Sequence, residues 1–276
     1  MNYSIEKLLD LPFYTEGPAI DREGNLFFTT LTGGKIYQKN QEGISSAWAE
    51  AACPNGQVVL PNGEHWICDS QNASVVRLSC TGQFVGNVIE GSCAGVSVRV
   101  PNDLVVDSEQ NLYFTDSVRH HGKVCYLGND GKEYIVAEGL DYPNGLVLGK
   151  DERCLYVAES YQNRIVKMAL TEPGVMAGKP EVFADLPIHA SNTAIGNLPD
   201  GLALDHKGNV WVAHYGMQAV QVLSAGGELL FTVDTQLPLT SNVCFMEDEP
   251  ERQKLIITGG YGEPGPGAVL LLTVLH

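Results

Sequence analysis

The stretch PNDLVVDSEQNLYFTD at residues 101–116 contains a Pro-led turn, a short apolar run, a polar turn and a second apolar run. This order is typical of two β-strands joined by a hairpin. The same order recurs at residues 16–30, 54–69, 143–160, 199–216 and 241–260. Runs such as KIYQK, VVRLS and RIVKM follow most copies and are expected to form third strands, and EYIVA and PEVFA are expected to form outer, fourth strands.

One polar residue occupies the same place near the start of every copy. These residues are Glu16, Asn55, Asn102, Asn144, Asp200 and Asn242, and their spacings are 39, 47, 42, 56 and 42. Repeats of this length built from short strands are typical of propeller blades. The sequence therefore predicts an all-β, six-bladed β-propeller with four-stranded blades, in which residues 1–276 form a single domain. The N-terminal SIEKLLD is expected to close the ring by pairing with the C-terminal GAVLLLTVL.

Charge and composition exclude several classes of partner. The chain has 17 Lys and Arg against 33 Asp and Glu, a formal net charge of −16. Nucleic acids and anionic membranes require clustered basic residues, so neither is expected as a partner. The N-terminus does not resemble a signal peptide, and no apolar run is long enough to cross a bilayer. We therefore expect a cytoplasmic protein whose seven cysteines are reduced and mostly serve as small apolar residues.

The six aligned polar residues predict a metal site. The first strand of each propeller blade lines the central channel, so equivalent positions converge at one of its ends. Two carboxylates and four carboxamides would meet there without a Lys or Arg at the repeated position. Facing carboxylates are costly unless a cation compensates them, and all-oxygen ligands suit hard divalent ions. Asn55 and Asn242 have a plainer alternative role as turn residues.

These segments together resemble the family of regucalcin (senescence marker protein) and the gluconolactonases. The resemblance rests on EGPAID at Glu16, PNDLVVDSEQNLYFTD at Asn102, YPNGLVLGKDERCLYVAES at Asn144 and PDGLALDHKGNVWVAHYG at Asp200, in this order and at these spacings. It implies a six-bladed propeller that binds one divalent metal ion. Ca²⁺ is the expected ion, and Mg²⁺, Mn²⁺, Zn²⁺ and Fe²⁺ are the alternatives.

The resemblance also assigns roles to individual residues. It implies that Glu16, Asn144 and Asp200 bind the metal and that Asn102, followed by Asp103, contacts the substrate. Arg99 is the candidate for holding sugar hydroxyls, although Val100 and Pro101 separate it from Asn102 by one residue more than in regucalcin. Ser117 stands where many family members have Pro.

The resulting hypothesis is metal-dependent hydrolysis of a sugar-type lactone, a small-molecule substrate. A metal ion can polarise the lactone carbonyl, and a carboxylate can activate water. Asp200 is the expected base, and attack by a metal-bound hydroxide is the alternative. Two other functions stay open, namely phosphotriester hydrolysis and non-catalytic metal binding. The sequence does not indicate the oligomeric state.

Two further regions have alternative interpretations. The long segment DLPIHASNTAIGNLPD at residues 185–200 predicts that residues 189–197 form a wall or lid of the pocket, or else a solvated loop. His214 could approach the channel mouth or belong to the core. Serine-hydrolase and nucleotide-binding motifs such as GxSxG and GxxxxGK[ST] do not occur.

Overall fold

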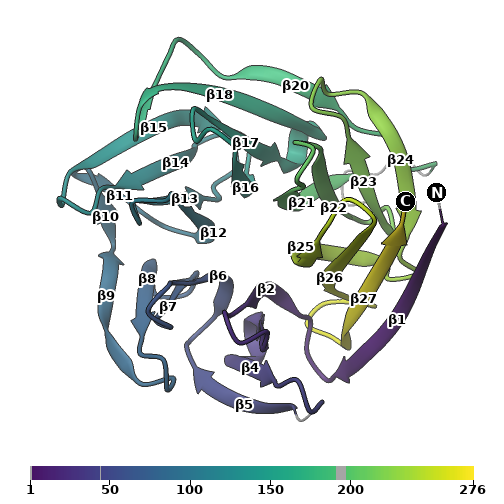
Figure 1. Ribbon diagram of the computed structural model, residues 1–276. Coiled ribbons are helices and arrows are strands. Elements are labelled where there is room, and N and C mark those ends of the chain that lie inside the picture. Colours follow the sequence, from purple (N-terminus) through teal and green to yellow (C-terminus); the bar gives the residue numbers. More distant parts are fainter. Residues whose placement is uncertain (1, 44, 191–196) are drawn as a thin grey trace.

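The computed structural model describes residues 2–43, 45–190 and 197–276 and is nearly all β-structure. Across these residues the strands form six antiparallel blades arranged in a ring (Figure 1), and residues 92–97 add a separate two-stranded sheet. In five blades the four main strands follow chain order from the centre outward, and the sixth takes its outer strand from the N-terminus. This is the six-bladed β-propeller that the repeat predicts. One blade carries a short additional strand, β19.

The strand bounds follow the predicted repeats closely. Blade one contains β2 (Glu16–Ile20), β3 (Leu26–Thr30), β4 (Lys35–Lys39) and β5 (Ser45–Glu50). Blade two contains β6 (Pro54–Val59), β7 (His65–Asp69), β8 (Ser74–Leu78) and β9 (Phe84–Glu90). Blade three contains β12 (Pro101–Val106), β13 (Leu112–Asp116), β14 (Gly122–Leu127) and β15 (Glu133–Leu140).

The second half of the ring has the same organisation. Blade four contains β16 (Pro143–Leu148), β17 (Cys154–Glu159), β18 (Arg164–Glu172), β19 (Val175–Met176) and β20 (Glu181–Asp185). Blade five contains β21 (Leu198–Leu204), β22 (Val210–Tyr215), β23 (Ala219–Leu223) and β24 (Leu229–Asp234). Blade six contains β25 (Leu239–Asp248), β26 (Arg252–Gly260), β27 (Gly267–Leu275) and β1 (Asn2–Leu11). The remaining elements are β10 (Ser92–Cys93), β11 (Val96–Ser97) and the 3₁₀ helices η1 (Leu31–Gly33) and η2 (Ser160–Gln162).

The two ends of the chain close the ring. Strand β1 pairs antiparallel with β27, from Asn2 opposite Leu275 to Leu11 opposite Gly267, and the termini lie near each other in Figure 1. The first strand in the sequence therefore becomes the outer strand of the last blade, as the sequence predicts. This pairing also covers an edge of β27 that would otherwise be exposed.

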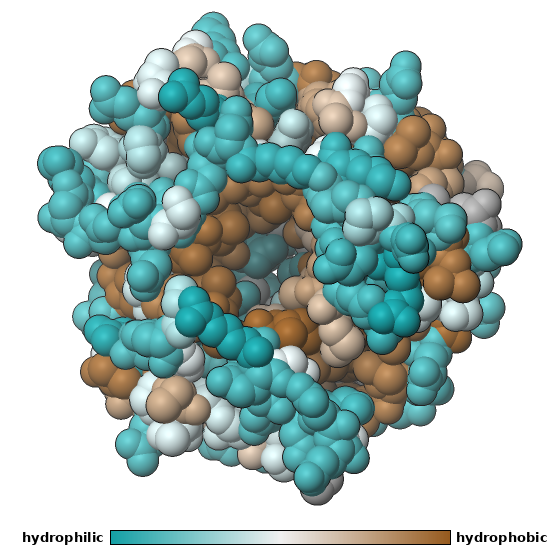
Figure 2. All heavy atoms as spheres, in the orientation of Figure 1, coloured by the Kyte–Doolittle hydropathy of each residue, from teal (hydrophilic) through white to brown (hydrophobic). Residues whose placement is uncertain are grey.

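The hydrophobic core lies between neighbouring blades. Within the described residues the buried apolar side chains form six clusters, and each cluster draws on two adjacent blades. The cluster between blades one and six, for example, joins Leu26 and Phe28 to Ile256 and Val269. The inner strands of each sheet are buried on both faces and carry nearly continuous apolar runs, whereas outer strands such as β5 and β9 are largely exposed. The stacked blades leave the centre of the ring hollow (Figure 2).

A bulge marks the aligned polar residue in the blades. The register between the first and second strands shifts at Glu16/Ala19, Pro54/Gln57, Pro101/Leu104, Pro143/Leu146, Pro199/Leu202 and Thr240/Asn242. A bulge bends the strand locally and redirects a side chain. Each aligned polar residue therefore lies at or beside a bulge, where its side chain does not have to alternate between the two faces of the sheet.

Hydroxyl groups of one blade hydrogen-bond to the backbone of the next blade at or beside its aligned polar residue. The Thr29 hydroxyl donates to the carbonyl of Asn55 at 2.9 Å, and the Thr115 hydroxyl donates to the carbonyl of Asn144 at 2.8 Å. The Ser160 hydroxyl donates to the carbonyl of Pro199 at 2.7 Å, directly before Asp200. Buried hydrogen bonds of this kind set the position of each first strand relative to its neighbour.

The described part of the chain contains no helix with the length and apolar character needed to span a bilayer. All seven cysteines are free thiols. Cys68, Cys93, Cys125 and Cys154 are buried, Cys53 and Cys244 are half-buried, and Cys80 is exposed. The expectation that most of them serve as small apolar residues therefore fits their burial.

Candidate metal centre

Five of the six aligned polar residues line one cavity of about 340 Å³ at the end of the channel where the first strands begin. They are Glu16, Asn55, Asn102, Asn144 and Asp200. The three proposed metal ligands and the proposed substrate contact Asn102 are thus brought together by four different blades. All five are at least nine-tenths buried.

The two acids in this cavity carry perturbed pKa values. Burial, followed by the charge of Asp103, raises the pKa of Glu16 to about 8, although hydrogen bonds from the Gly17 N–H and Asn242 oppose the shift. Burial and the charges of Glu16 and Asp103 raise the pKa of Asp200 well above its ordinary range, opposed by a hydrogen bond from Asn144. Buried carboxylates that repel each other in this way need a proton or a cation to compensate them.

The residues of the cavity fit a divalent cation. Of the described residues that line it, none is Lys, Arg or His, so no side-chain cation neutralises Glu16 and Asp200. Among the described residues no three His, Cys, Asp or Glu side chains form a metal-type cluster, so any metal here must take amide as well as carboxylate ligands. Two carboxylate groups and neighbouring amide oxygens form an all-oxygen donor set, which hard cations such as Ca²⁺ and Mg²⁺ prefer.

Tyrosines and one further acid form the rim of this cavity, and the repeat pattern does not predict them. Tyr14, Tyr142, Tyr161 and Tyr215 line the cavity together with Glu263. The Tyr215 hydroxyl donates to Glu263 Oε1 at 3.0 Å. The cavity therefore has a third carboxylate, which is exposed and lies outside the aligned positions.

Three of these residues share a topological origin that could have revealed them. In an antiparallel blade, the connection between the second and third strands returns to the end where the first strand begins. Tyr161 lies in this connection in blade four, Tyr215 ends the second strand of blade five, and Glu263 lies in the connection of blade six. The Gly- and Pro-rich segment YGEPGPG at residues 261–267 thus supplies a carboxylate to the rim.

Asp103 and Asn242 lie in a neighbouring part of the channel. Both line a second cavity with Gln57 and apolar residues of the first strands, and neither lines the cavity of Glu16 and Asp200. Asn242 Nδ2 donates to Asp103 Oδ2 at 3.4 Å, and burial raises the pKa of Asp103 to about 6. The ring of six polar residues is therefore not symmetric, because five face the mouth and Asn242 faces the channel.

Two other residues considered from the sequence lie outside the cavity. Arg99 is exposed and lines a separate depression with His121 and Lys123, so its role in holding sugar hydroxyls stays a prediction from resemblance. His214 is fully buried, and its Nε2 lies 2.9 Å from Asn163 Oδ1. Burial lowers the pKa of His214 to about 3, which fits the core role. The wall or lid expected at residues 189–197 falls mostly on residues 191–196, which lie outside the described residues.

The fold and this cavity define a six-bladed propeller with an all-oxygen polar site at the mouth of its channel. Over residues 14–260 the chain matches the family described as the SMP-30/gluconolactonase/LRE-like region, and it belongs to that family. This confirms the resemblance that the repeated segments indicate.

Individual relatives include named lactonases. Lactonase drp35 of Staphylococcus aureus (strain MW2) is 27% identical over 224 residues, covering 77% of this chain and 67% of that protein. The solved structure of a gluconolactonase from Xanthomonas campestris is similar with a TM-score of 0.82 and 26% identity, covering 98% of this chain and 89% of that one. Regucalcin of Agrobacterium tumefaciens, a calcium-binding protein, is similar in fold with a TM-score of 0.78 and 17% identity, covering 98% of this chain and 93% of that one. Lactone hydrolysis is therefore the activity that the relatives support.

Proposed function

We propose that this protein hydrolyses a sugar-type lactone with the help of one divalent metal ion, for which Ca²⁺ is the leading candidate. The observation that carries the proposal is the gathering of Glu16, Asp200 and three amides in one cavity without a basic side chain among its described lining residues. Membership of the gluconolactonase family supports the reaction class. The calcium-binding regucalcin among the structural neighbours supports the choice of ion.

In this proposal Glu16, Asn144 and Asp200 hold the ion. The bound ion would polarise the lactone carbonyl and stabilise the negative charge that develops on its oxygen. Asn102 lies in the same cavity, where its amide can orient the substrate. A carboxylate oxygen of Asp200 would accept a proton from the attacking water.

The rim would bind the hydroxyl groups of the substrate. Tyr215 already donates its hydroxyl hydrogen to Glu263, which leaves the second carboxylate oxygen of Glu263 to accept a hydrogen bond from a sugar hydroxyl. Tyr142 and Tyr161 pack edge to face with ring centroids 5.6 Å apart and form an adjacent aromatic wall. A carboxylate that accepts hydrogen bonds from hydroxyl groups, beside aromatic rings, suits a polyhydroxylated lactone better than a lactone without hydroxyl groups.

A substrate panel tests this function. The protein is assayed with added Ca²⁺ on aldonolactones, on hydroxyl-free aliphatic lactones and on an aryl phosphotriester. We expect kcat/KM to be highest for the aldonolactones. A preference for the phosphotriester would replace the proposal with organophosphate hydrolysis. Absence of turnover on the whole panel, with metal bound, would favour a non-catalytic metal-binding protein.

Substitution of Glu263 tests the rim directly. Glu263→Gln is expected to raise KM for an aldonolactone about tenfold, because a charge-assisted hydrogen bond contributes about 1.5–3 kcal/mol. We expect kcat to change by less than about threefold and hydroxyl-free lactones to be unaffected, because the interaction binds ground and transition states alike. Glu228→Gln, an exposed glutamate on blade five, is the matched control. An equal loss on both lactone types would contradict the assignment.

A further inference from the structure

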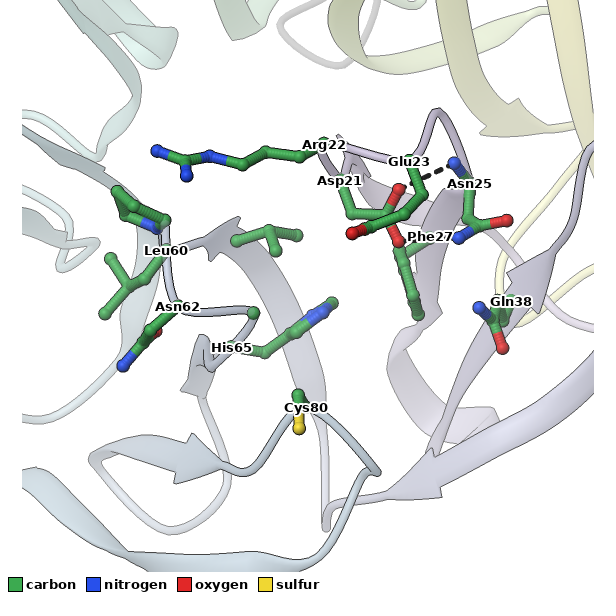
Figure 3. Close-up of a pocket in the computed structure, with 13 residues that line it drawn as sticks. Asp21, Arg22, Glu23, Asn25, Phe27, Gln38, Leu60, Asn62, His65 and Cys80 are labelled. Carbon is green, nitrogen blue, oxygen red and sulfur yellow. Dashed lines mark hydrogen bonds between the residues drawn. The ribbon is translucent and has the colours of Figure 1, made fainter.

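A cavity of about 410 Å³ lies between blades one and two, apart from the candidate metal centre (Figure 3). Residues of the β2–β3 and β6–β7 connections line it, and it shares no lining residue with the metal cavity. Glu16 begins strand β2, whereas Asp21 follows its end. At about 3.3 Å per residue, the two cavities lie at opposite ends of this strand, roughly 15 Å apart.

His65 in this cavity departs from the pattern of the other blades. It pairs with Val59 at the last position of the β6–β7 ladder before the turn. The equivalent residues of blades one, three, four and five are aliphatic, namely Leu26, Leu112, Leu155 and Val210. Blade six has the buried Gln253 there, whose side-chain amide donates to Asp248. A histidine that is only 1% exposed therefore stands where four of the other five blades place an apolar core residue. Sequences that break a local rule of their own fold often do so for function.

Gln57 departs from the pattern together with His65. It pairs with Ile67, whereas blades three, four and five have Leu104, Leu146 and Leu202 at the equivalent place. His65 Nδ1 lies 3.1 Å from Gln57 Oε1. Blade two has thus replaced a pair of apolar core positions with a hydrogen-bonded polar pair, and any polar atom of this pair that is buried without a partner costs free energy.

The hydrogen bonds of Gln57 fix the tautomer of His65. Gln57 Nε2 donates to the carbonyl of Gly17 at 2.7 Å, so Gln57 Oε1 must face the imidazole as an acceptor. His65 Nδ1 therefore carries the hydrogen and donates it, and Nε2 is left with a lone pair. Burial lowers the pKa of His65 to about 4, so the ring is neutral at pH 7. Among the described residues, His65 Nε2 has no hydrogen-bond partner.

The surroundings of His65 restrict what can pair with this nitrogen. Its ring packs against Phe27 and Trp48, with centroids 4.4 Å away in each case. In Figure 3 the ring points toward the side of the cavity where Asp21 and Phe27 lie. Both carboxylate oxygens of Asp21 already accept hydrogen bonds from Asn25 at 2.7 Å. Inside the cavity His65 therefore offers an acceptor beside an aromatic wall.

We propose that this cavity is a second binding site, which takes a small uncharged ring compound carrying one O–H or N–H donor. The donor bonds to His65 Nε2, and the ring packs on Phe27 and Leu60. Anions are disfavoured because Asp21 and Glu23 outnumber the lone cation Arg22 among the described lining residues. The volume lies within the range of ordinary small-molecule sites. The site is independent of the proposed lactonase activity.

Phenol and anisole test this proposal, because they share a ring but only phenol has a donor. Binding to the wild-type protein is followed by isothermal titration and by the ¹⁵N resonance of His65 Nε2. We expect phenol to bind at least about tenfold more tightly than anisole and to shift that resonance, because a buried acceptor left unpaired costs about 1–3 kcal/mol. Equal affinities, or no shift from either compound at millimolar concentration, would overturn the proposal.

Two variants separate the role of His65 from a general effect on folding. His65→Leu introduces the aliphatic residue type of blades one, three, four and five and is expected to remove the preference for phenol. His65→Leu leaves Gln57 Oε1 without its hydrogen-bond partner, which could destabilise the fold. The double variant Gln57→Leu/His65→Leu replaces both polar residues with an apolar pair and serves as the second test. A phenol preference that survives in a folded variant of either kind would contradict the assignment to His65.

Discussion

Asp200→Asn is expected to lower kcat/KM for an aldonolactone by about 10³-fold or more. The substitution removes both a proposed metal ligand and the proposed base, and loss of general acid–base catalysis alone costs 10²- to about 10⁴-fold. The same change should leave the metal-free protein at least as stable as the wild type. It replaces a carboxyl group whose ionised form is disfavoured by burial and by Glu16 and Asp103, and it keeps the shape of the side chain.

Activity and stability are therefore expected to move in opposite directions. Steady-state kinetics and thermal unfolding of the chelator-treated protein measure the two effects. Asp185→Asn, an exposed aspartate on β20, is the matched control and should change neither. If Asp200→Asn retained more than a tenth of wild-type activity, Asp200 could not hold both roles. A marked loss of stability in the metal-free variant would instead indicate a structural role.

Gly145→Ala is expected to destabilise the fold by about 3 kcal/mol or more, because overpacking against rigid atoms is costly. A Cβ atom at Gly145 would lie 2.3 Å from the Asp200 carbonyl oxygen and 2.5 Å from Gly201 Cα. These are backbone atoms of the neighbouring first strand, so no side-chain rotation can relieve the contact. Movement of this strand would also displace Asp200, and activity should fall with stability.

Chemical denaturation measures this effect. Gly226→Ala is the control, because a Cβ atom there would meet only Ser224 Oγ, at 3.6 Å. We expect the control to change the free energy of unfolding by less than about 0.5 kcal/mol. If Gly145→Ala were similarly neutral, the first strands would not be packed as closely around the channel as described.

The repeat allowed most of the fold to be predicted. Six copies of one hairpin pattern imply six blades, and the apolar runs at both ends of the chain indicate how the ring closes. The reason is physical, because each blade must present the same apolar faces to two neighbours. The aligned Glu16, Asn144 and Asp200 were predicted to converge for the same reason, and they line one cavity.

The parts that could not be predicted are those that break the repeat. Glu263 lies in a connection whose position depends on blade geometry, and no copy of it exists elsewhere in the pattern. Asn242 is aligned with the other polar residues, yet it faces the channel beside Asp103. His65 and Gln57 were not singled out, because only the strand register shows that their equivalents in blades three, four and five are apolar. Aligning the repeats in the sequence identifies the residues that the blades share. The strand register in the structure identifies the positions at which one blade differs from the others.

The dependence of lactone hydrolysis on metal tests the central claim most directly. The protein is stripped with a chelator, verified as metal-free by elemental analysis, and assayed on aldonolactones with and without Ca²⁺, Mg²⁺, Mn²⁺, Zn²⁺ or Fe²⁺, with Glu16→Gln alongside. We predict no turnover in the stripped protein, recovery with at least one of these ions, and no recovery in Glu16→Gln. Undiminished turnover in the verified metal-free protein, or metal binding without hydrolysis of any lactone, would contradict the account.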